Sequence, residues 1–426
     1  MQKADLIIHN AGQLVTCASG GRPKRGEAML DVGIVVDGAV AVLDGKFAAV
    51  GTSGDILREY RSENVIDAEG RVVCPGFVDP HTHIVYAGDR LDEFELKIKG
   101  ADYLEILANG GGIISTVEQT RKASVESLVA QASARLDKML ACGTTTVEIK
   151  TGYGLDTESE LKMLNVIAEL ESSHVIDIVP TFLAAHAVPP EHKSNPNVYV
   201  NEICDTMMSL AWKWFVGSRF YGKTPFFCDV FCENGAFTLD QSRKILETAR
   251  SLGFKLKAHV DQFTNLGGSR LAIEMGAVSI DHLDAISDEE IALLAKSSTI
   301  GMVIPTENFN AGKTQFANAR KLIDSGCAVA LSTDYNPGSA PCPSQPMAMA
   351  IACRYQKLLP AEALNAATIN AAFAVGSDKS GSIEVGKSAD MLLFNSKDYR
   401  EIAAEFGGNL VKDVIKAGVL VRATAK

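Results

Sequence analysis

Two histidines one residue apart stand at the end of an apolar run in "CPGFVDPHTHIVYAGDR", residues 74–90. On an extended strand, residues i and i+2 point to the same side, so His81 and His83 can direct two imidazoles at one point. Imidazole is a common ligand of zinc and other borderline divalent ions. A lone His-x-His is a weak signal, so the motif predicts a metal site only if further ligands come from elsewhere in the chain.

Eight apolar, β-branched segments could position such ligands. They span residues 71–81, 144–150, 176–186, 226–233, 254–262, 277–284, 299–305 and 328–334, and helical patterns such as 157–172 and 238–253 lie between them. Near-continuous hydrophobic strands alternating with helices predict a parallel sheet covered on both faces. Eight such units over roughly 250 residues match an α/β fold of the (β/α)8 TIM-barrel type. An open doubly wound sheet is the alternative, but no Gly-x-Gly-x-x-Gly follows the first strand.

Chemistry in such a barrel sits where the strands end. Five of the eight histidines fall at these ends, and the eighth segment ends at an aspartate: His81, His83, His186, His259, His282 and Asp334. We expect one divalent metal ion, zinc or iron, to be held by His81, His83, His259 and Asp334, with a water completing the shell. A metal ion of this kind lowers the pKa of its water towards neutrality. We expect His282 to orient that water or the substrate.

Both chain ends are predicted to form a separate small β unit. Residues 32–51 alternate Val and Ala around two Asp-Gly pairs, which predict hairpin turns. The final segments likewise consist of short strand-like runs separated by turn residues. We predict a β-sandwich domain of residues 1–72 plus 376–426 beside a barrel domain of residues 73–375. The stretch 209–227 contains both tryptophans and is predicted to be a packed insertion or an oligomer contact.

Composition restricts the class of protein. The chain has 426 residues, 46% of them hydrophobic, which is ample for a large core, and a net charge of −11, which argues against nucleic-acid partners and anionic membranes. We find neither a signal-peptide pattern nor an apolar run long enough to cross a bilayer. Nine cysteines without a paired framework favour reduced thiols and a cytoplasmic location. A homodimer is the expectation for an oligomer.

The ligand pattern resembles the amidohydrolase superfamily: a His-x-His on the first strand, single histidines on the fifth and sixth, and an aspartate on the eighth. The resemblance covers almost the whole chain and implies a metal-dependent hydrolase. Many members bridge two metal ions with a carboxylated lysine on the fourth strand. Segment 226–233 contains no lysine, and Lys150 lies on the second strand instead. We therefore predict one metal ion rather than two.

Closer motifs, including "EIKTGYGL", "TFLAAHAVPPEHK" and "STDYNPGSAP", are similar to the branch that opens the ring of 4-imidazolone-5-propanoate to N-formimidoyl-L-glutamate in histidine degradation. As a mechanism we expect Asp334 to carry the proton and His282 to help hold the oxyanion. The resemblance implies substrate contacts from Arg90, Tyr103, Tyr153, His186, Gln262, Asn336, Gly338 and Ser339. A guanidinium such as that of Arg90 suits the carboxylate of this small anionic imidazolone.

Alternatives stay open at this point. Ala184, Gln262 and Thr306 depart from the usual pattern of this branch, which bears on the substrate. A purine or pyrimidine deaminase of the same superfamily would use the same metal ligands with other pocket residues. A non-catalytic barrel scaffold is a third possibility, although such relatives typically lose metal ligands. Arg90 could equally form a surface ion pair, and Tyr153 could anchor a loop.

Overall fold

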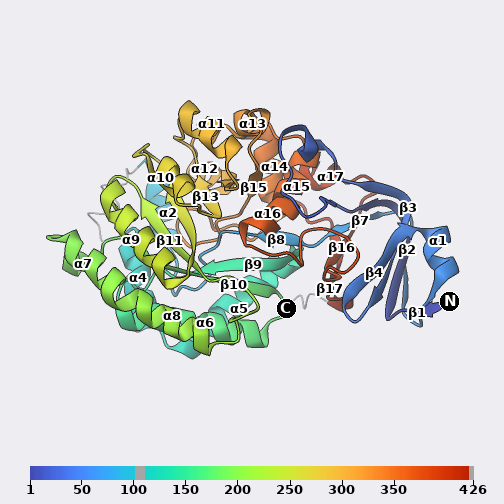
Figure 1. Ribbon diagram of the computed structural model, residues 1–426, viewed down its shortest axis with the longest axis horizontal. Coiled ribbons are helices and arrows are strands. Elements are labelled where there is room, and N and C mark those ends of the chain that lie inside the picture. The colour runs from blue at the N-terminus through green and yellow to red at the C-terminus, as the bar shows by residue number, and fades with distance from the viewer. Residues whose placement is uncertain (101–110, 422–426) are drawn as a thin grey trace.

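The structure is a computed structural model that describes residues 1–100 and 111–421. Two eight-stranded sheets dominate the described part of the chain. In Figure 1 the barrel and its surrounding helices occupy one side of the molecule, and the second sheet, built from both chain ends, occupies the other. The short strands β1 (Gln2–Lys3) and β5 (Tyr60–Arg61) pair separately.

The first sheet is parallel and confirms the predicted barrel strands. Each of the eight predicted segments contains one of its strands, in consecutive order around the sheet. The strands are β8 (Phe77–Asp79), β9 (Thr144–Lys150), β10 (Asp177–Ala185), β11 (Phe227–Cys232), β12 (Lys255–Val260), β13 (Ser279–His282), β14 (Ile300–Val303) and β15 (Val329–Leu331). Their carboxyl ends therefore meet at one end of the barrel, where a site was expected.

Strands β8 and β15 form the seam of the barrel without a continuous ladder of hydrogen bonds. A single bridge pairs Thr82 with Tyr335 just beyond the two strands. Below it, Gln345 Nε2 donates to Val78 O at 3.0 Å and to Leu331 O at 3.3 Å. A side-chain amide thus takes the place of missing backbone pairing and satisfies buried carbonyl groups on both strands.

Helices follow the barrel strands, as the alternating pattern predicted. The predicted helix 238–253 is α9, which begins after a capping box of Thr238 and Gln241 and ends at Gly253, whose φ of 105° suits glycine. The helices between β8 and β15 are α2 (Leu91–Ile98), α4 (Ile113–Lys122), α5 (Val125–Ala141), α6 (Thr157–Ser173), η2 (Pro190–His192), α7 (Pro196–Glu202), η3 (Ile203–Met207), α8 (Met208–Gly217), α9 (Leu239–Leu252), α10 (Gly268–Glu274), α11 (Asp288–Lys296), α12 (Pro305–Asn310) and α13 (Ala319–Asp324). Helices α14 (Gln345–Tyr355), α15 (Pro360–Ala367) and α16 (Ile369–Ala374) follow β15.

The second sheet is mixed and combines strands from both chain ends. Its order is β18-β17-β16-β7-β2-β3-β4, with β6 also paired to β2. The strands are β2 (Leu6–Val15), β3 (Ile34–Leu43), β4 (Lys46–Thr52), β6 (Val65–Asp67), β7 (Val72–Pro75), β16 (Met391–Phe394), β17 (Val411–Lys416) and β18 (Val419–Val421). Buried residues of these strands share one cluster, and a bridge between Lys46 of the edge strand β4 and Ser388 brings that edge back towards β16, so the sheet curves around its own core. The remaining helices are η1 (Gly26–Leu30), α1 (Ser53–Glu59) and α17 (Glu401–Ala404).

The two Asp-Gly pairs in this sheet behave differently, which corrects the expectation of two hairpins. Asp44 and Gly45, with φ of 51° and 72°, form the turn between β3 and β4. Asp37 and Gly38 instead lie inside β3, where the register against β2 shifts. A Cβ on Gly38 would overlap Leu14, so this glycine permits the close approach of a bulged strand.

The segment with both tryptophans packs within the same chain. The ring centroid of Trp212 lies 5.1 Å from that of Phe254, and the centroid of Trp214 lies 5.7 Å from that of Phe226. These contacts favour the packed insertion over the oligomer contact. The nine cysteines, all within the described ranges, form no disulfide. Of the helices described, none combines the length and apolar character that crossing a membrane requires.

Candidate active site

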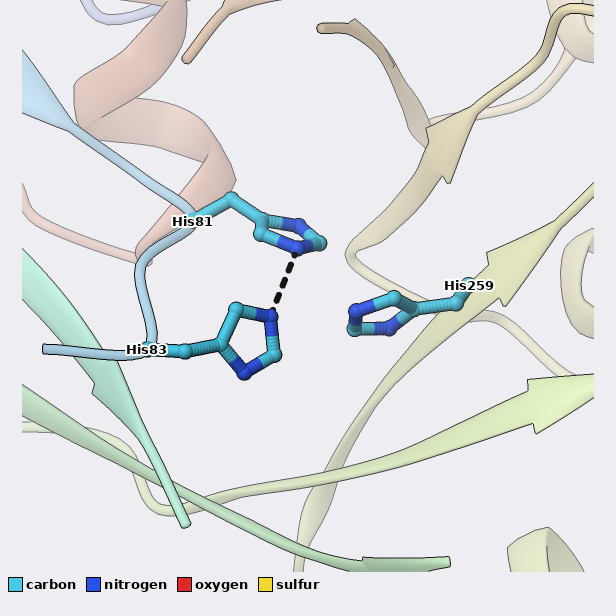
Figure 2. A group of neighbouring side chains, drawn as sticks. All are labelled: His81, His83 and His259. Carbon is cyan, nitrogen blue, oxygen red and sulfur yellow. Dashed lines mark hydrogen bonds between the residues drawn. The ribbon is translucent and has the colours of Figure 1, made fainter. Parts of the chain in front are cut away.

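Three imidazoles converge at the carboxyl end of the barrel. The candidate ligand atoms of His81, His83 and His259 lie within 4.8 Å of one another, and all three residues are buried. Figure 2 shows the three rings directed at one another from two sides of the barrel. His83 Nε2 lies 3.3 Å from His81 Nε2. His81 and His83 lie just past β8, and the alternation of an extended chain persists there because Thr82 bridges to Tyr335.

Buried carboxylates fix the orientation of two of these rings. His81 Nδ1 lies 2.7 Å from Asp281 Oδ2, and His259 Nδ1 lies 3.0 Å from Asp229 Oδ2. Asp281 accepts the proton of His81 Nδ1, so His81 Nε2 presents a lone pair, whereas Asp229 lies beside His259 Nδ1 at ion-pair distance without hydrogen-bond geometry. This carboxylate–histidine arrangement is the usual support of a metal-binding imidazole.

The electrostatics of the cluster also suit a cation. Burial holds the pKa of His81 and of His83 well below the ordinary value, and burial also lowers the pKa of His259, so the rings are neutral. Both ring nitrogens of His259 are buried, and neither makes a hydrogen bond with any residue that the structure describes. A buried lone pair without a donor is costly, and a metal ion would satisfy it. The three histidines therefore fit a divalent ion.

Asp334 completes the set from the opposite side of the seam. Its Oδ1 lies 3.5 Å from His83 Nε2 and 3.6 Å from His81 Nε2. Burial raises the pKa of Asp334 to about 7. Its φ of 51° places the backbone in the left-handed region, which is costly for a residue other than glycine and is typical of functional sites.

The segment around Asp334 is held from both sides. Before it, Asp79 accepts hydrogen bonds from the backbone N–H and the hydroxyl of Thr333 at 3.1 and 2.5 Å. After it, Asn336 Oδ1 accepts from the N–H groups of Gly338 and Ser339, both at 2.8 Å. The hydroxyl of Ser339 donates to Asp334 Oδ2 at 3.4 Å. Asn336 thus shapes the turn that carries the serine to the carboxylate.

His282 stands beside the three imidazoles. Its ring centroid lies 5.2 Å from that of His259, and its Nδ1 lies 3.4 Å from Glu307 Oε2. Burial alone would lower the pKa of His282, but Glu307 outweighs burial and raises it. His282, Asp284 and Glu307 form a second group of possible ligands, yet Lys313 Nζ lies 3.0 Å from Glu307 Oε1 and already neutralises it. We interpret this group as one that orients His282.

Two further rings border the cluster. His186 stacks on His83, with ring centroids 4.8 Å apart and an interplanar angle of 15°. Its Nδ1 donates to Gly152 O at 3.1 Å, which leaves Nε2 for a ligand. Tyr153 lies 5.9 Å from His83, measured between ring centroids. Burial raises the pKa of Tyr153, so its hydroxyl remains a hydrogen-bond donor.

Arg90 is close to the Asp334 turn and is not a surface ion pair with its aspartate neighbours. Its Nη2 lies 2.5 Å from Glu93 Oε2, and Glu93 Oε1 accepts the N–H of Gly112 at 2.6 Å. A Cβ on Gly338 would overlap the guanidinium, so Arg90 packs directly on that glycine. Its Nε is buried and has no hydrogen-bond partner in the described ranges. Arg90 therefore retains donor capacity for an anionic ligand.

Comparison with known proteins agrees with this geometry. A model described as the amidohydrolase family matches residues 233–421, and a second with the same description matches residues 64–101. The imidazolonepropionase of Chloroflexus aggregans is 51% identical and covers 99% of both chains. That of Herpetosiphon aurantiacus is 51% identical over 99% of this chain and 98% of the relative, and that of Geobacillus kaustophilus is 45% identical over 98% and 97%.

The chain belongs to the imidazolonepropionase family. Solved structures of lower identity share the fold of this imidazolonepropionase family member. An adenosine deaminase from Xanthomonas campestris with bound zinc aligns with a TM-score of 0.73 at 20% identity, covering 98% of this chain and 93% of that one. A 5-methylcytosine deaminase from Klebsiella pneumoniae aligns with a TM-score of 0.70 at 17% identity, covering 98% and 97%.

Not every site residue predicted from the sequence joins the cluster. Tyr103 lies outside the described residues. Gln262 lies in the loop after β12, is half-buried, and makes no side-chain hydrogen bond to a described residue. The other two departures from the pattern of the imidazolonepropionase family have structural contacts: Ala184 O accepts from the hydroxyl of Tyr199 at 2.9 Å, and Thr306 donates to Thr333 O at 2.7 Å.

Sequence reasoning missed the carboxylates behind the rings. Asp229, Asp281 and Glu307 each face a histidine of the site, and all three are buried. A usable signal was present, because Asp229 and Asp281 are charged residues inside apolar strand segments, where a charge is costly unless it is paired. Glu307 offered no such signal, because it lies on the short helix α12 after β14 and not inside an apolar strand segment.

Proposed function

We propose that this protein hydrolyses the cyclic amide C–N bond of 4-imidazolone-5-propanoate to N-formimidoyl-L-glutamate with one divalent metal ion, zinc or iron. Relatives named imidazolonepropionase, 45–51% identical over nearly the full length, support the reaction and the substrate. The observation that carries the proposal is the convergence of His81, His83 and His259 beside Asp334, with an unpartnered buried Nε2 on His259.

The metal would be held by the imidazole nitrogens of His81, His83 and His259 and by Asp334. Bound there, a divalent ion supplies Lewis acidity for the ring carbonyl and lowers the pKa of a water molecule. The donor set of three neutral nitrogens and one carboxylate is one that suits zinc or iron.

Asp334 would move the proton. Its Oδ1 faces the histidines and its Oδ2 faces the hydroxyl of Ser339, so the carboxylate lies within the site rather than behind it. As the water oxygen forms its bond to the ring carbonyl carbon, Asp334 takes a proton from the water. It then returns this proton to the ring nitrogen as the C–N bond breaks.

His282 would stabilise the developing oxyanion. Its Nδ1 is turned towards Glu307, which raises the pKa of His282 against the effect of burial, so the imidazolium form would offer an Nε2–H to the carbonyl oxygen of the substrate. A hydrogen bond at that oxygen is stronger in the transition state than in the ground state, because the negative charge develops there.

Arg90 and Tyr153 would bind the propanoate group. Both are polar donors near the Asp334 turn, and the guanidinium packs on Gly338 while the tyrosine hydroxyl stays protonated. Pairing a guanidinium with a carboxylate gives both charge and geometric selectivity. The arrangement supports an anionic imidazolone over a neutral nucleobase.

The test is an assay of the purified protein with 4-imidazolone-5-propanoate before and after chelation, together with its metal content. Hydrolysis that is lost on chelation and recovered with zinc or iron is expected. Parallel assays of ammonia release from purine and pyrimidine substrates address the deaminase alternative. Ammonia release without imidazolone hydrolysis would replace the proposed substrate, and the absence of both activities in a metal-loaded sample would contradict catalysis.

A further inference from the structure

A cluster of charged side chains fills the barrel below the three histidines. Its members come from β9, β11, β12 and β13, and each is completely buried: Glu148, Lys150, Asp229, Lys257 and Asp281. Barrel interiors are ordinarily filled by branched apolar residues. Replacing buried ion pairs with well-packed apolar side chains is often neutral or stabilising, so a cluster of this kind is weak as a device for stability alone.

Lys150 is at the centre of this cluster. Its Nζ lies 2.7 Å from Asp229 Oδ2, 2.9 Å from Glu148 Oε1 and 3.7 Å from Asp281 Oδ2. One ammonium thus faces three carboxylates that come from three different strands. Lys257 is equally buried, but its Nζ contacts Glu148 Oε1 at 3.1 Å and Pro80 O at 2.8 Å instead.

Two of the carboxylates around Lys150 are those that orient metal-binding rings. Asp229 Oδ2 lies 3.0 Å from His259 Nδ1, and Asp281 Oδ2 lies 2.7 Å from His81 Nδ1. In each case the oxygen that faces the imidazole is also the oxygen that faces Lys150. The lysine therefore connects the support of one ring to the support of the other.

We infer that Lys150 is a positioning residue for the metal-binding histidines, acting through Asp229 and Asp281. The inference rests on the proposed metal site. Two like-charged carboxylates facing each other in a water-free interior repel strongly. The shared ammonium holds both oxygens towards one point, and this fixes the spacing of the rings of His81 and His259, whose centroids are 4.4 Å apart.

Two physical explanations predict opposite changes in metal affinity when Lys150 is replaced. If its charge only repelled the metal ion, Lys150→Met would tighten metal binding. If the lysine positions the histidines through their carboxylates, the same change loosens metal binding, by about 10- to 100-fold as is typical for groups that support metal ligands. We expect the second outcome.

The experiment measures metal affinity by competition with a chelator in the wild type, Lys150→Met and Lys257→Met. Lys257→Met is the matched control, because it removes an equally buried ammonium from the same cluster without touching Asp229 or Asp281. Both variants are expected to lose stability in the metal-free state. Only Lys150→Met is expected to lose metal affinity and to change the visible absorption of bound cobalt, which reports ligand geometry. Equal or tighter binding by Lys150→Met, or equal losses in both variants, overturns the inference.

A second comparison keeps the inference testable if Lys150→Met folds poorly. Asp229→Asn and the double variant Lys150→Met/Asp229→Asn remove the partner charge as well. If Lys150 acts through Asp229 and Asp281, its loss costs less metal affinity in the Asp229→Asn background than in the wild type, whereas additive losses overturn the inference. A wild type that binds no metal would refute the proposed function itself, which separates the two failures.

Discussion

Asp334 Oδ1 lies 3.5 Å from His83 Nε2, although the two residues follow the last and the first strands of the barrel. The contact exists because the seam between β8 and β15 is closed by Thr82, Tyr335 and Gln345. The candidate ligand set is therefore a direct product of barrel closure. The residues in and around this set each lead to a separate testable prediction.

Changing Asp334 should remove catalysis. Asp334→Asn keeps the shape of the side chain but takes away the proton acceptor, and turnover should fall by about 10³-fold, within the range for general acid–base groups. Asp334→Ala should in addition weaken metal retention. Steady-state rates and metal content after dialysis measure the two effects. Asp288→Asn, which alters an exposed ion pair, is the control, and near-normal turnover in Asp334→Asn would rule out the assigned role.

Changing Arg90 should weaken substrate binding. Arg90→Ala removes a charged donor to the carboxylate of the substrate, and this should raise KM by about 10- to 100-fold, the equivalent of one charge-assisted hydrogen bond. The effect on kcat should be smaller. Arg58→Ala, which breaks an exposed pair with Asp55, serves as the control. An unchanged KM would mean that the carboxylate is bound elsewhere.

A methyl group on Gly338 should weaken substrate binding by displacing Arg90. In Gly338→Ala the new Cβ overlaps the guanidinium, which is the mobile end of a flexible side chain, so Arg90 should shift while the fold stays intact. KM should rise as in Arg90→Ala, with little change in the melting temperature. Gly54→Ala, where no atom lies near the added Cβ, is the matched control. A large loss of stability with unchanged KM would contradict this relationship.

Removing the metal should destabilise the protein as well as inactivate it. A ligand that binds only the folded state stabilises it by about 4 kcal/mol at a thousandfold excess over its Kd. We therefore expect chelation to lower the melting temperature and zinc or iron to restore it. Calorimetry of the treated and reloaded protein measures this change. A melting temperature that does not respond to chelation would contradict a bound structural role for the ion.

Stability at alkaline pH should depend on Lys416, which links the two sheets. Its Nζ lies 2.7 Å from Asp390 Oδ2 and 2.6 Å from Asp177 Oδ2 at the start of β10. Burial alone would lower the pKa of Lys416, but Asp390 and Asp177 outweigh it and raise the pKa above 10.5. The ion pairs of Lys416 with Asp390 and Asp177 therefore stabilise the fold fully below pH 10.5. This contribution is lost as the pH rises through the folded-state pKa of Lys416.

Lys416→Met should lower the free energy of unfolding by about 3 kcal/mol at neutral pH, because it leaves a buried carboxylate unpaired. Between neutral and alkaline pH, the difference in unfolding free energy between wild type and variant should narrow above pH 10.5. Denaturant titrations across this range measure it. Lys321→Met breaks an exposed pair and should cost less than about 1 kcal/mol. A gap that stays unchanged as the pH rises from neutral through 10.5 and beyond would contradict this role of Lys416.

The fold could be predicted from the sequence because its signals are local and periodic. Each barrel strand is a short apolar run, and His81, His83, His259 and Asp334 each lie at or just beyond the end of such a run. Parallel strands bring their ends together, so position along the chain was enough to group these residues.

Other features could not be predicted because they depend on neighbours across the sheet. The Asp-Gly pair at residues 44–45 makes a turn, whereas the pair at residues 37–38 stays inside β3 next to a bulge in the partner strand β2. The pairing of Asp229 with His259 and of Asp281 with His81 likewise joins strands that only the folded sheet places side by side. Their burial inside apolar runs signals a partner but does not identify it.

The seam between β8 and β15 also sets an order of events during biosynthesis. His81 and His83 leave the ribosome early, whereas Asp334 and the amide of Gln345 that stitches the last strand to the first emerge only after the whole barrel has been made. A nascent chain that has not yet reached Asp334 therefore carries the three imidazoles of His81, His83 and His259 but lacks the carboxylate and the closed seam that complete the site. We therefore expect the metal ion to bind stably only once the barrel has closed. An occupied site would then indicate a completely folded barrel.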